Sequence, residues 1–315
     1  MPCRAVTGNI FVLTIRARSS IIVSMNRLDT TKRAAIVRCL IEGCSIRSTV
    51  RMTGASKNTV VKLLVELGTV CTQYMDDNMR KLPCQRIQVD EIWQFVGAKA
   101  KNVKPHHFED GGYAGDVWTW TAIDAHTKLV PCFMLGARDA NAARDFMEDL
   151  APRLKNRIQL TSDGLKVYIN AVYTAFGNDI DYAQLVKVYG IDPQAEKRYS
   201  PAICTSCEAH AISGRPDPDH INTSYVERQN LSMRMSMRRF TRLTNAFSKK
   251  VENHAAAVGL YFMWYNFGRV HQTLKTTPAV KAGIADHVWS VDEVIGLLQA
   301  VEPKATRAAK AGISN

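Results

Sequence analysis

The chain has 315 residues, of which 46% are hydrophobic and 22% charged, as is typical of a globular protein. No run approaches the ~18 apolar residues that a membrane-spanning helix needs, so we expect no membrane partner. The net charge of +12 favours a polyanionic partner, because phosphates attract lysine and arginine and release counterions on binding.

The eight cysteines do not form the pattern of a secreted disulfide framework. Most are isolated in apolar stretches, as Cys39 is in IVRCLIEG and Cys132 is in LVPCFML. This distribution favours a reducing compartment, and we expect a cytoplasmic protein.

Residues 1–24 differ in character from the regular stretch MNRLDTTKRAAIVRCL that begins at Met25. We expect either a disordered extension or a start codon assigned too early. The alternative is a strand or helix that packs on the body of the protein.

Residues 25–70 have the pattern of three short helices, with Ser45 and Ser56 suited to cap the second and third. The third helix, predicted over about 56–67, has its apolar residues at the spacing of one buried face. The opposite face presents Lys57, Asn58 and Lys62. Such a unit is typical of a helix-turn-helix domain that binds DNA, although three-helix units also serve as packing or dimerisation modules. Residues 71–85 are predicted to be a helix tail and linker.

From residue 86 the hydrophobic pattern changes from a helical period to the alternation of strands. The chain then predicts three strands, a helix, a strand, a helix, a strand, an irregular segment over 191–222 and two more helices. The predicted strands are 86–96, 117–124, 129–135, 157–164 and 182–190, and the predicted helices are 141–154, 167–177, 224–240 and 251–267.

Three carboxylates occupy separate elements of this pattern: Asp90 in the middle of a strand, Asp163 at the end of a strand, and Glu227 in the first turn of a helix. Each has an ordinary explanation if taken alone, as a turn residue or as a complement to the helix dipole. Asp90 is the hardest to explain in this way, because a buried charge is costly unless it is paired or bound to a metal. Glu91 is the obvious rival, but side chains alternate along a strand, so we expect it to face away from Asp90.

Together these residues resemble the insertion-sequence-one type of bacterial DDE transposase. The matching motifs are VDEIWQFVGAK around Asp90, TSDGLKVY around Asp163 and YVERQNLSMRMSMRRFTRLTNAFSKKVENH around Glu227, and YNFGRVHQTLKTTPA resembles the closing segment of integrase-type transposases. The resemblance covers about residues 30–280. It departs from the compact family pattern in the long interval between Asp163 and Glu227, where 191–222 looks inserted.

The resemblance implies an α/β fold, with a ribonuclease-H-like mixed sheet of five strands flanked by helices and preceded by the helix-turn-helix domain. It implies a catalytic domain over 86–272, followed by a C-terminal tail over 273–315. It also implies two divalent cations, Mg²⁺ or Mn²⁺, held by Asp90, Asp163 and Glu227, a cage of hard oxygen ligands suited to phosphoryl transfer.

The helix that begins near Glu227 is strongly basic, with seven lysines or arginines and no acidic residue from Arg228 to Val251. Its spacing places Glu227, Asn230, Arg234 and Arg238 on one face. The resemblance makes Arg234 an assistant of the catalytic carboxylates. The alternative is a solvated surface helix. The candidate DNA-binding residues of this region are Arg228, Asn230, Arg234, Arg238, Arg239 and Arg242.

Cys204, Cys207, His210 and His220 form the pattern CxxCxxH followed by a second histidine. The spacing matches common zinc sites poorly, so we do not expect structural zinc. Near the C-terminus, Arg269 and His271 are suited either to contact DNA or to pack.

The sequence predicts a transposase that binds double-stranded element ends and target DNA as a homo-oligomer, in the cytoplasm and on the nucleoid. Two other functions stay open. A regulator descended from such an enzyme would bind DNA without cutting it, and a ribonuclease-H-like nuclease or resolvase would cut without joining.

Overall fold

The computed structural model describes residues 28–108, 112–190, 203–241 and 244–300. The predicted extension over 1–24 lies outside the described residues, as does Arg242. None of the described helices is long and apolar enough to cross a bilayer.

The described residues form two compact units that are interleaved along the chain. The first comprises Arg80–Gln94 and Asp116–Asn230, and the second comprises the described parts of Thr14–Met79, Phe95–Gly115 and Leu231–Asn315. The domain limits expected from the sequence stay predictions.

The first unit is built on a mixed sheet with the strand order β3-β2-β1-β4-β5-β6. β1 is parallel to β4 and β4 is parallel to β5, whereas β2 pairs antiparallel with β3 and β5 pairs antiparallel with β6. The strands are β1 (Arg86–Val96), β2 (Gly115–Asp124), β3 (Cys132–Gly136), β4 (Ile158–Asp163), β5 (Ile180–Gly190) and β6 (Ile203–Ser213).

The sixth strand corrects the expectation of five. β6 lies within the segment 191–222 that the sequence indicated to be irregular, and it pairs along its length with β5. Its side chains from Cys204 to Ile212 are exposed, so burial imposes no alternation of apolar and polar residues. The pattern by which the other strands were predicted is therefore missing from β6.

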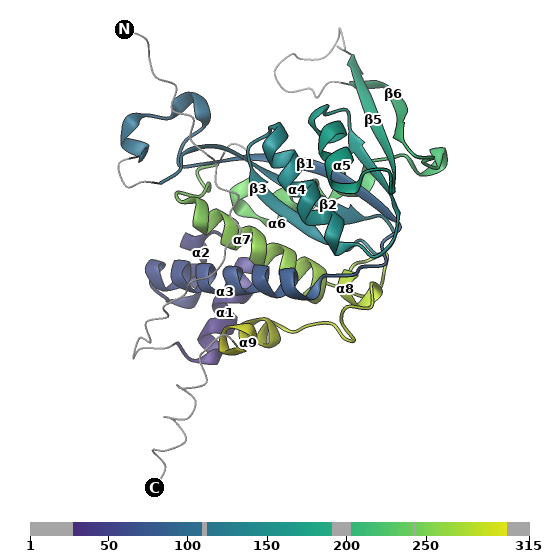
Figure 1. Ribbon diagram of the computed structural model, residues 1–315. Coiled ribbons are helices and arrows are strands. Elements are labelled where there is room, and N and C mark those ends of the chain that lie inside the picture. The colour runs from purple at the N-terminus through teal and green to yellow at the C-terminus, as the bar shows by residue number, and fades with distance from the viewer. Residues whose placement is uncertain (1–27, 109–111, 191–202, 242–243, 301–315) are drawn as a thin grey trace, which may run out of the picture. The chain divides into compact units, whose positions relative to one another are not determined.

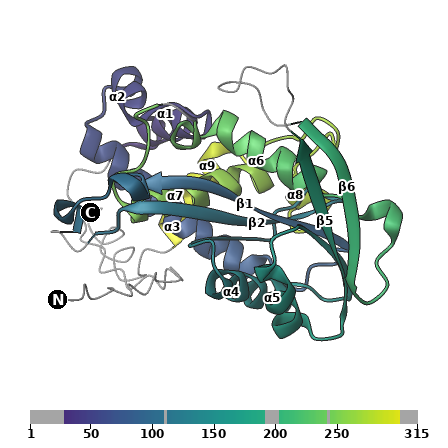
Figure 2. The ribbon, with the colours of Figure 1, turned by 90° about the horizontal axis from the view of Figure 1, so that it is seen from above.

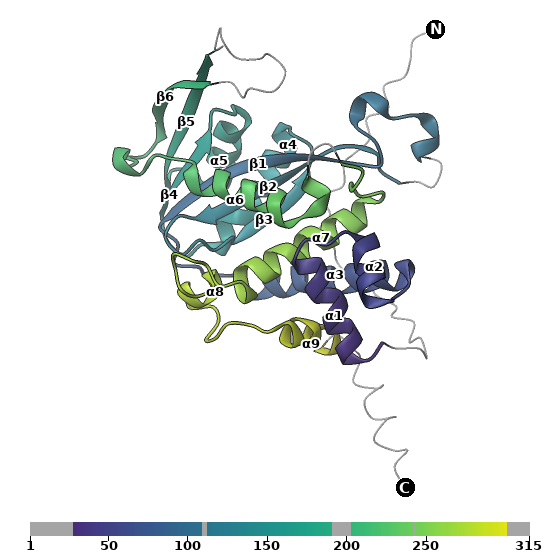
Figure 3. The same ribbon diagram turned by 180° about the vertical axis from the view of Figure 1, so that it is seen from behind.

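Helices α4 (Ala140–Leu150) and α5 (Val167–Phe176) cover one face of the sheet in Figure 1. Their apolar sides meet the strands in a core around Trp120, whose ring packs against Phe146 and Tyr168. Trp120 is fully buried, and its indole N–H donates to the carbonyl of Ala137, 3.0 Å away. The opposite face is covered by the start of α6 (Ser224–Ser236), as Figure 3 shows.

The second unit is helical. Its elements are α1 (Thr30–Ile41), α2 (Ile46–Thr53), α3 (Lys57–Asn78), α7 (Val251–Met263), α8 (Pro278–Lys281) and α9 (Val291–Ala300). The hydroxyls of Ser45 and Ser56 cap α2 and α3 as predicted, and Gly54 ends α2 in the left-handed conformation that glycine adopts without strain.

The longest helix, α3, packs against α7, and these two elements have the most extensive helix–helix contact of the unit (Figure 3). Glycine permits the close approach, because a Cβ atom at Gly68 would lie only 2.0 Å from the carbonyl oxygen of Ala256. α9 packs on α1 and α3, so part of the segment predicted as a C-terminal tail belongs to the helical core. α1, α2 and α3 confirm the predicted helices, whereas their function as a DNA-binding domain stays a prediction.

Candidate active site

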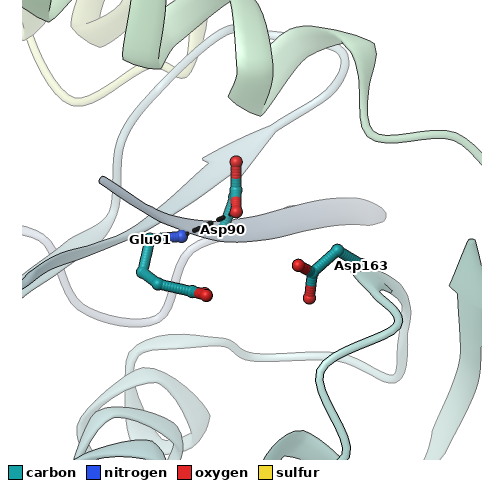
Figure 4. Close-up of side chains that lie close together, drawn as sticks. All are labelled: Asp90, Glu91 and Asp163. Atoms are coloured by element: carbon teal, nitrogen blue, oxygen red, sulfur yellow. Dashed lines mark hydrogen bonds between the residues drawn. The ribbon is translucent and has the colours of Figure 1, made fainter. Parts of the chain in front are cut away.

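The two aspartates of the predicted site meet because of the register between two parallel strands. Val89 on β1 pairs with Ser162 on β4, which places Asp90 beside Asp163 at the next position of each strand. Oxygen atoms of Asp90, Asp163 and Glu91 all lie within 4.8 Å of one another (Figure 4). Among the described residues this is the group of carboxylates suited to hold a metal ion.

Asp90 is held by two hydrogen bonds. One carboxylate oxygen accepts from the backbone N–H of Glu91 at 2.8 Å, and the other accepts from the side-chain amide of Asn230 on α6, also at 2.8 Å. Burial, together with the charges of Glu91 and Asp163, raises the pKa of Asp90 to about 7. The site therefore concentrates negative charge that a bound cation would neutralise.

Glu91 leaves β1 on the opposite side from Asp90, as the alternation of the strand predicted (Figure 4). Its longer side chain nevertheless brings the carboxylate into the acidic group. It accepts from Arg138 Nε at 2.6 Å and from the Tyr168 hydroxyl at 3.0 Å. Burial and the charge of Asp163 raise the pKa of Glu91, against the lowering effect of the Arg138 and Tyr168 hydrogen bonds.

Arg138 is a site residue that sequence analysis missed. It follows β3, its guanidinium stacks over the Trp118 ring 4.9 Å from the centroid, and it lies 3.8 Å from a carboxylate oxygen of Asp163. Arg138 therefore contacts both Glu91 and Asp163 and partly balances the charge of the acidic group. Nothing in the local sequence distinguishes this arginine, because its position depends on contacts with residues of β1, β2 and β4 that lie far from it in the sequence.

Glu227 lies in the first turn of α6, as predicted, but outside the group of three carboxylates. Its carboxylate accepts from Lys187 on β5 and from the Thr223 hydroxyl. The charge of Glu227 contributes to the raised pKa of Asp90, although it is the weakest of the causes. The structure thus brings two members of the predicted triad together and keeps the third nearby, in an ion pair.

Gln88 positions the start of α6 against β1. Its side-chain oxygen accepts from the backbone N–H groups of Tyr225 and Val226, at 2.8 and 3.1 Å, and so caps the helix. Gln88 and Asp90 are two residues apart on one face of β1. Asn230 contacts Asp90 from α6, the helix that Gln88 caps. Sequence analysis assigned Asn230 to DNA binding, whereas the structure places its amide on the candidate catalytic aspartate.

The other predicted DNA-binding residues have different surroundings. The side chains of Lys57, Asn58 and Lys62 are exposed at the start of α3, and Lys62 lies 3.8 Å from Glu66. On α6 and just beyond it, Arg228 and Arg238 are exposed and Arg234 is half-buried.

Arg239 is turned inward. Its guanidinium donates to the Ser248 hydroxyl at 2.9 Å and to the carbonyl of Asn253 at 2.7 Å, and burial lowers its pKa to about 10. These contacts attach Arg239 to the protein interior, and its assignment to DNA binding stays a prediction.

The chain is similar in sequence to a protein of a bacterial insertion element. The insertion element iso-IS1n protein InsB of Shigella dysenteriae is 26% identical over 180 residues, which are 57% of this chain and 95% of the relative. The resemblance to the insertion-sequence-one type of transposase is confirmed. No protein-family model matches the chain. The solved structure of a piggyBac transposase synaptic complex with hairpin DNA aligns over 95% of this chain and 79% of that chain, with 10% identity and a TM-score of 0.38.

Proposed function

We propose that the chain is a DDE-type transposase, which binds the ends of its element and catalyses metal-dependent cleavage and strand transfer of DNA. The observation that carries the proposal is the adjacency of Asp90 and Asp163 at the β1–β4 pair, with the helix that bears Glu227 attached to β1 through Gln88 and Asn230. The insertion-element relative supports transposition as the process.

We further propose that the first unit is the ribonuclease-H-like catalytic fold. The order of helices and strands from β1 to α6 follows the order predicted for that fold, with β6 added between β5 and α6. The same proposal assigns α1 to α3 to a helix-turn-helix domain that reads element ends.

The residues of the site fit hard divalent cations, Mg²⁺ or Mn²⁺. Asp90, Asp163 and Glu91 present oxygen atoms within 4.8 Å of one another, and oxygen is the ligand that these ions prefer. Asn230 donates to Asp90, and its own side-chain oxygen is buried with no hydrogen-bond partner among the described residues. Asp90, Asp163 and Glu227 would hold two cations, which when bound polarise phosphoryl oxygens and lower the pKa of water.

The chain's own groups have distinct tasks in this proposal. Asn230 fixes the orientation of the Asp90 carboxylate. Lys187 pairs with Glu227, and it would have to release that carboxylate for Glu227 to hold a cation. Glu91 acts as a positioning residue, because its buried carboxylate anchors Arg138 beside Asp163.

DNA contact is assigned to two surfaces. Lys57, Asn58 and Lys62 would contact base edges from the start of α3. Arg228, Arg234 and Arg238 would bind phosphates along the strand held at the carboxylates, because Arg234 follows Glu227 by two helical turns. The active complex would be a homo-oligomer that holds two element ends, located in the cytoplasm on the nucleoid.

A gel assay with labelled element ends and Mg²⁺ tests this function against its rivals. We expect wild-type protein to cut and join, and Asp90→Asn, Asp163→Asn and Glu227→Gln to bind ends but neither cut nor join. Glu91→Gln is the matched comparison, since glutamine can still accept from Arg138, and it should retain joining. Binding without cutting in wild-type protein would indicate a regulator, and cutting without joining would indicate a nuclease.

A further inference from the structure

β6 is the strand at the edge of the sheet (Figure 2). Two exposed cysteines lie close together on this strand. The sulfur atoms of Cys204 and Cys207 are 3.6 Å apart, and the Cys204 thiol is 3.4 Å from the carbonyl oxygen of Ser206. Both side chains are exposed, so reagents in solution can reach them.

An irregularity in the β5–β6 ladder explains why these residues meet. Side chains three positions apart on a regular strand point to opposite faces. Here Cys204 pairs with Tyr189, Ser206 pairs with Val188 and Cys207 pairs with Lys187, so Thr205 is an extra residue without a partner in the register. This β-bulge removes one step of the alternation and places both cysteines on the same face.

We propose that Cys204 and Cys207 are a redox-active pair that closes reversibly into an intrachain disulfide. With hydrogen peroxide as oxidant, the thiolate of one cysteine attacks an oxygen of the peroxide, which forms a sulfenic acid and, with one proton, releases one water. The sulfur of the second cysteine then displaces the hydroxyl group, which forms the S–S bond and releases a second water. Two thiols and one peroxide thus give one disulfide and two waters, and a dithiol reductant reverses the oxidation.

The same geometry argues against a soft-metal site built on the full CxxCxxH pattern. The alternation after the bulge places His210 on the opposite face from Cys207, where it lies 3.5 Å from Glu208. His220 is bonded to Asp217 at 2.7 Å. Among the described residues, no group of three metal-binding side chains includes a cysteine or a histidine.

The location of the pair links it to the candidate active site, a consequence that rests on the proposed function. Cys207 pairs across the ladder with Lys187, the residue that holds the Glu227 carboxylate. Closing the disulfide changes the β5–β6 ladder where Lys187 is positioned. We therefore expect oxidation to change the rate of DNA strand cleavage through the Lys187–Glu227 ion pair.

The test uses the full chain, first reduced and then treated with hydrogen peroxide, with free thiols counted after unfolding in denaturant. We expect two thiols to be lost and then restored by dithiothreitol. Peptide mapping should find one internally cross-linked peptide that contains Cys204 and Cys207 and has lost the mass of two hydrogen atoms. Cys204→Ser and Cys207→Ser should each abolish this cross-link.

The double variant Cys39→Ser/Cys44→Ser is the matched control, because Cys39 is hydrogen-bonded to Cys44 and forms a second close thiol pair. It should retain the reversible loss of two thiols. A loss that persists in Cys204→Ser, the absence of any loss in wild-type protein, or one tightly bound Zn²⁺ that protects both thiols would each overturn the proposal. Thiol counting requires no DNA, so its outcome is independent of whether the chain is a transposase.

Discussion

The side-chain amide of Asn230 donates a 2.8 Å hydrogen bond to the carboxylate of Asp90. This contact joins the helix that carries Glu227 to the strand that carries Asp90, and it lies one helical turn beyond Glu227. The two carboxylates are therefore positioned by one connected group of side chains, although Glu227 itself is held by Lys187.

Replacing Lys187 by methionine should lower the Mg²⁺ concentration needed for half-maximal joining. The lysine competes with a cation for Glu227, and a partly exposed ion pair of this kind corresponds to a change of about 1.5- to 5-fold. The measurement is a Mg²⁺ titration of the joining reaction. Lys187→Arg keeps the charge and should behave like wild-type protein. An unchanged titration in Lys187→Met would argue against Glu227 as a metal ligand.

His254 should make the protein less stable in mild acid. It is fully buried on α7, and burial, followed by the charge of Arg239, lowers its pKa from 6.5 to about 3. As the pH falls, His254 is therefore protonated in the unfolded chain before it is protonated in the folded protein. The stability that the neutral ring provides is complete above about pH 6.5 and is lost as the pH falls towards 3. Below about pH 6 the loss approaches 1.4 kcal/mol per pH unit.

Urea unfolding of wild-type protein and His254→Gln between about pH 7 and pH 5 isolates this effect, since other groups titrate equally in both proteins. The stability of wild-type protein should fall more steeply as the pH is lowered. Parallel curves would show that folding does not lower the pKa of His254.

Lys57, Asn58 and Lys62 are expected to read the sequence of the element ends. Alanine at these positions should weaken binding to end DNA more than binding to random DNA, because base contacts carry specificity and phosphate contacts do not. Competition binding with the two DNAs measures the difference. Glu66→Gln, which removes only the partner of Lys62, is the control and should preserve the specificity ratio. Equal losses of affinity for both DNAs would indicate that these residues contact phosphates and not base edges.

Arg234 and Arg238 are expected to bind phosphates beyond the carboxylates. Replacing both with alanine should weaken DNA binding and reduce the salt dependence by about one unit of log–log slope for each lost contact. Binding across a salt series, with a thermal melt alongside, measures both effects. Arg239→Ala is the contrasting variant, because its inward hydrogen bonds predict a loss of thermal stability instead. An unchanged slope in the double variant would mean that neither arginine touches phosphate.

The helices and strands with buried faces were predictable from the sequence, because burial of one face requires apolar residues at a regular spacing. The end of α3 shows both the success and the limit of such a pattern. Leu67, Cys71 and Met75 continue the buried side at intervals of four residues, which agrees with the helix tail expected within 71–85, but the polar residues between them did not indicate that the helix ends at Asn78. β6 was missed for the opposite reason, since its exposed side chains follow no burial pattern.

The identity of the candidate site residues could be predicted more fully than their arrangement. Motif resemblance selected Asp90, Asp163 and Glu227, but only the parallel register of β1 and β4 places the two aspartates together. The side of β1 from which Glu91 leaves was predicted correctly. The reach of its side chain and the partner Arg138 depend on packing between distant segments, which periodicity does not report.

Metal-specificity exchange at Asp163 tests the central claim most directly. A thiolate ligand favours softer cations than a carboxylate does, so Asp163→Cys should lose joining in Mg²⁺ and regain part of it when Cd²⁺ is added. Asp163→Asn should stay inactive with either ion. Recovery confined to the cysteine variant is the predicted result and would place a catalytic cation at Asp163. Full joining by Asp163→Cys in Mg²⁺ alone, or by Asp163→Asn, would contradict the account.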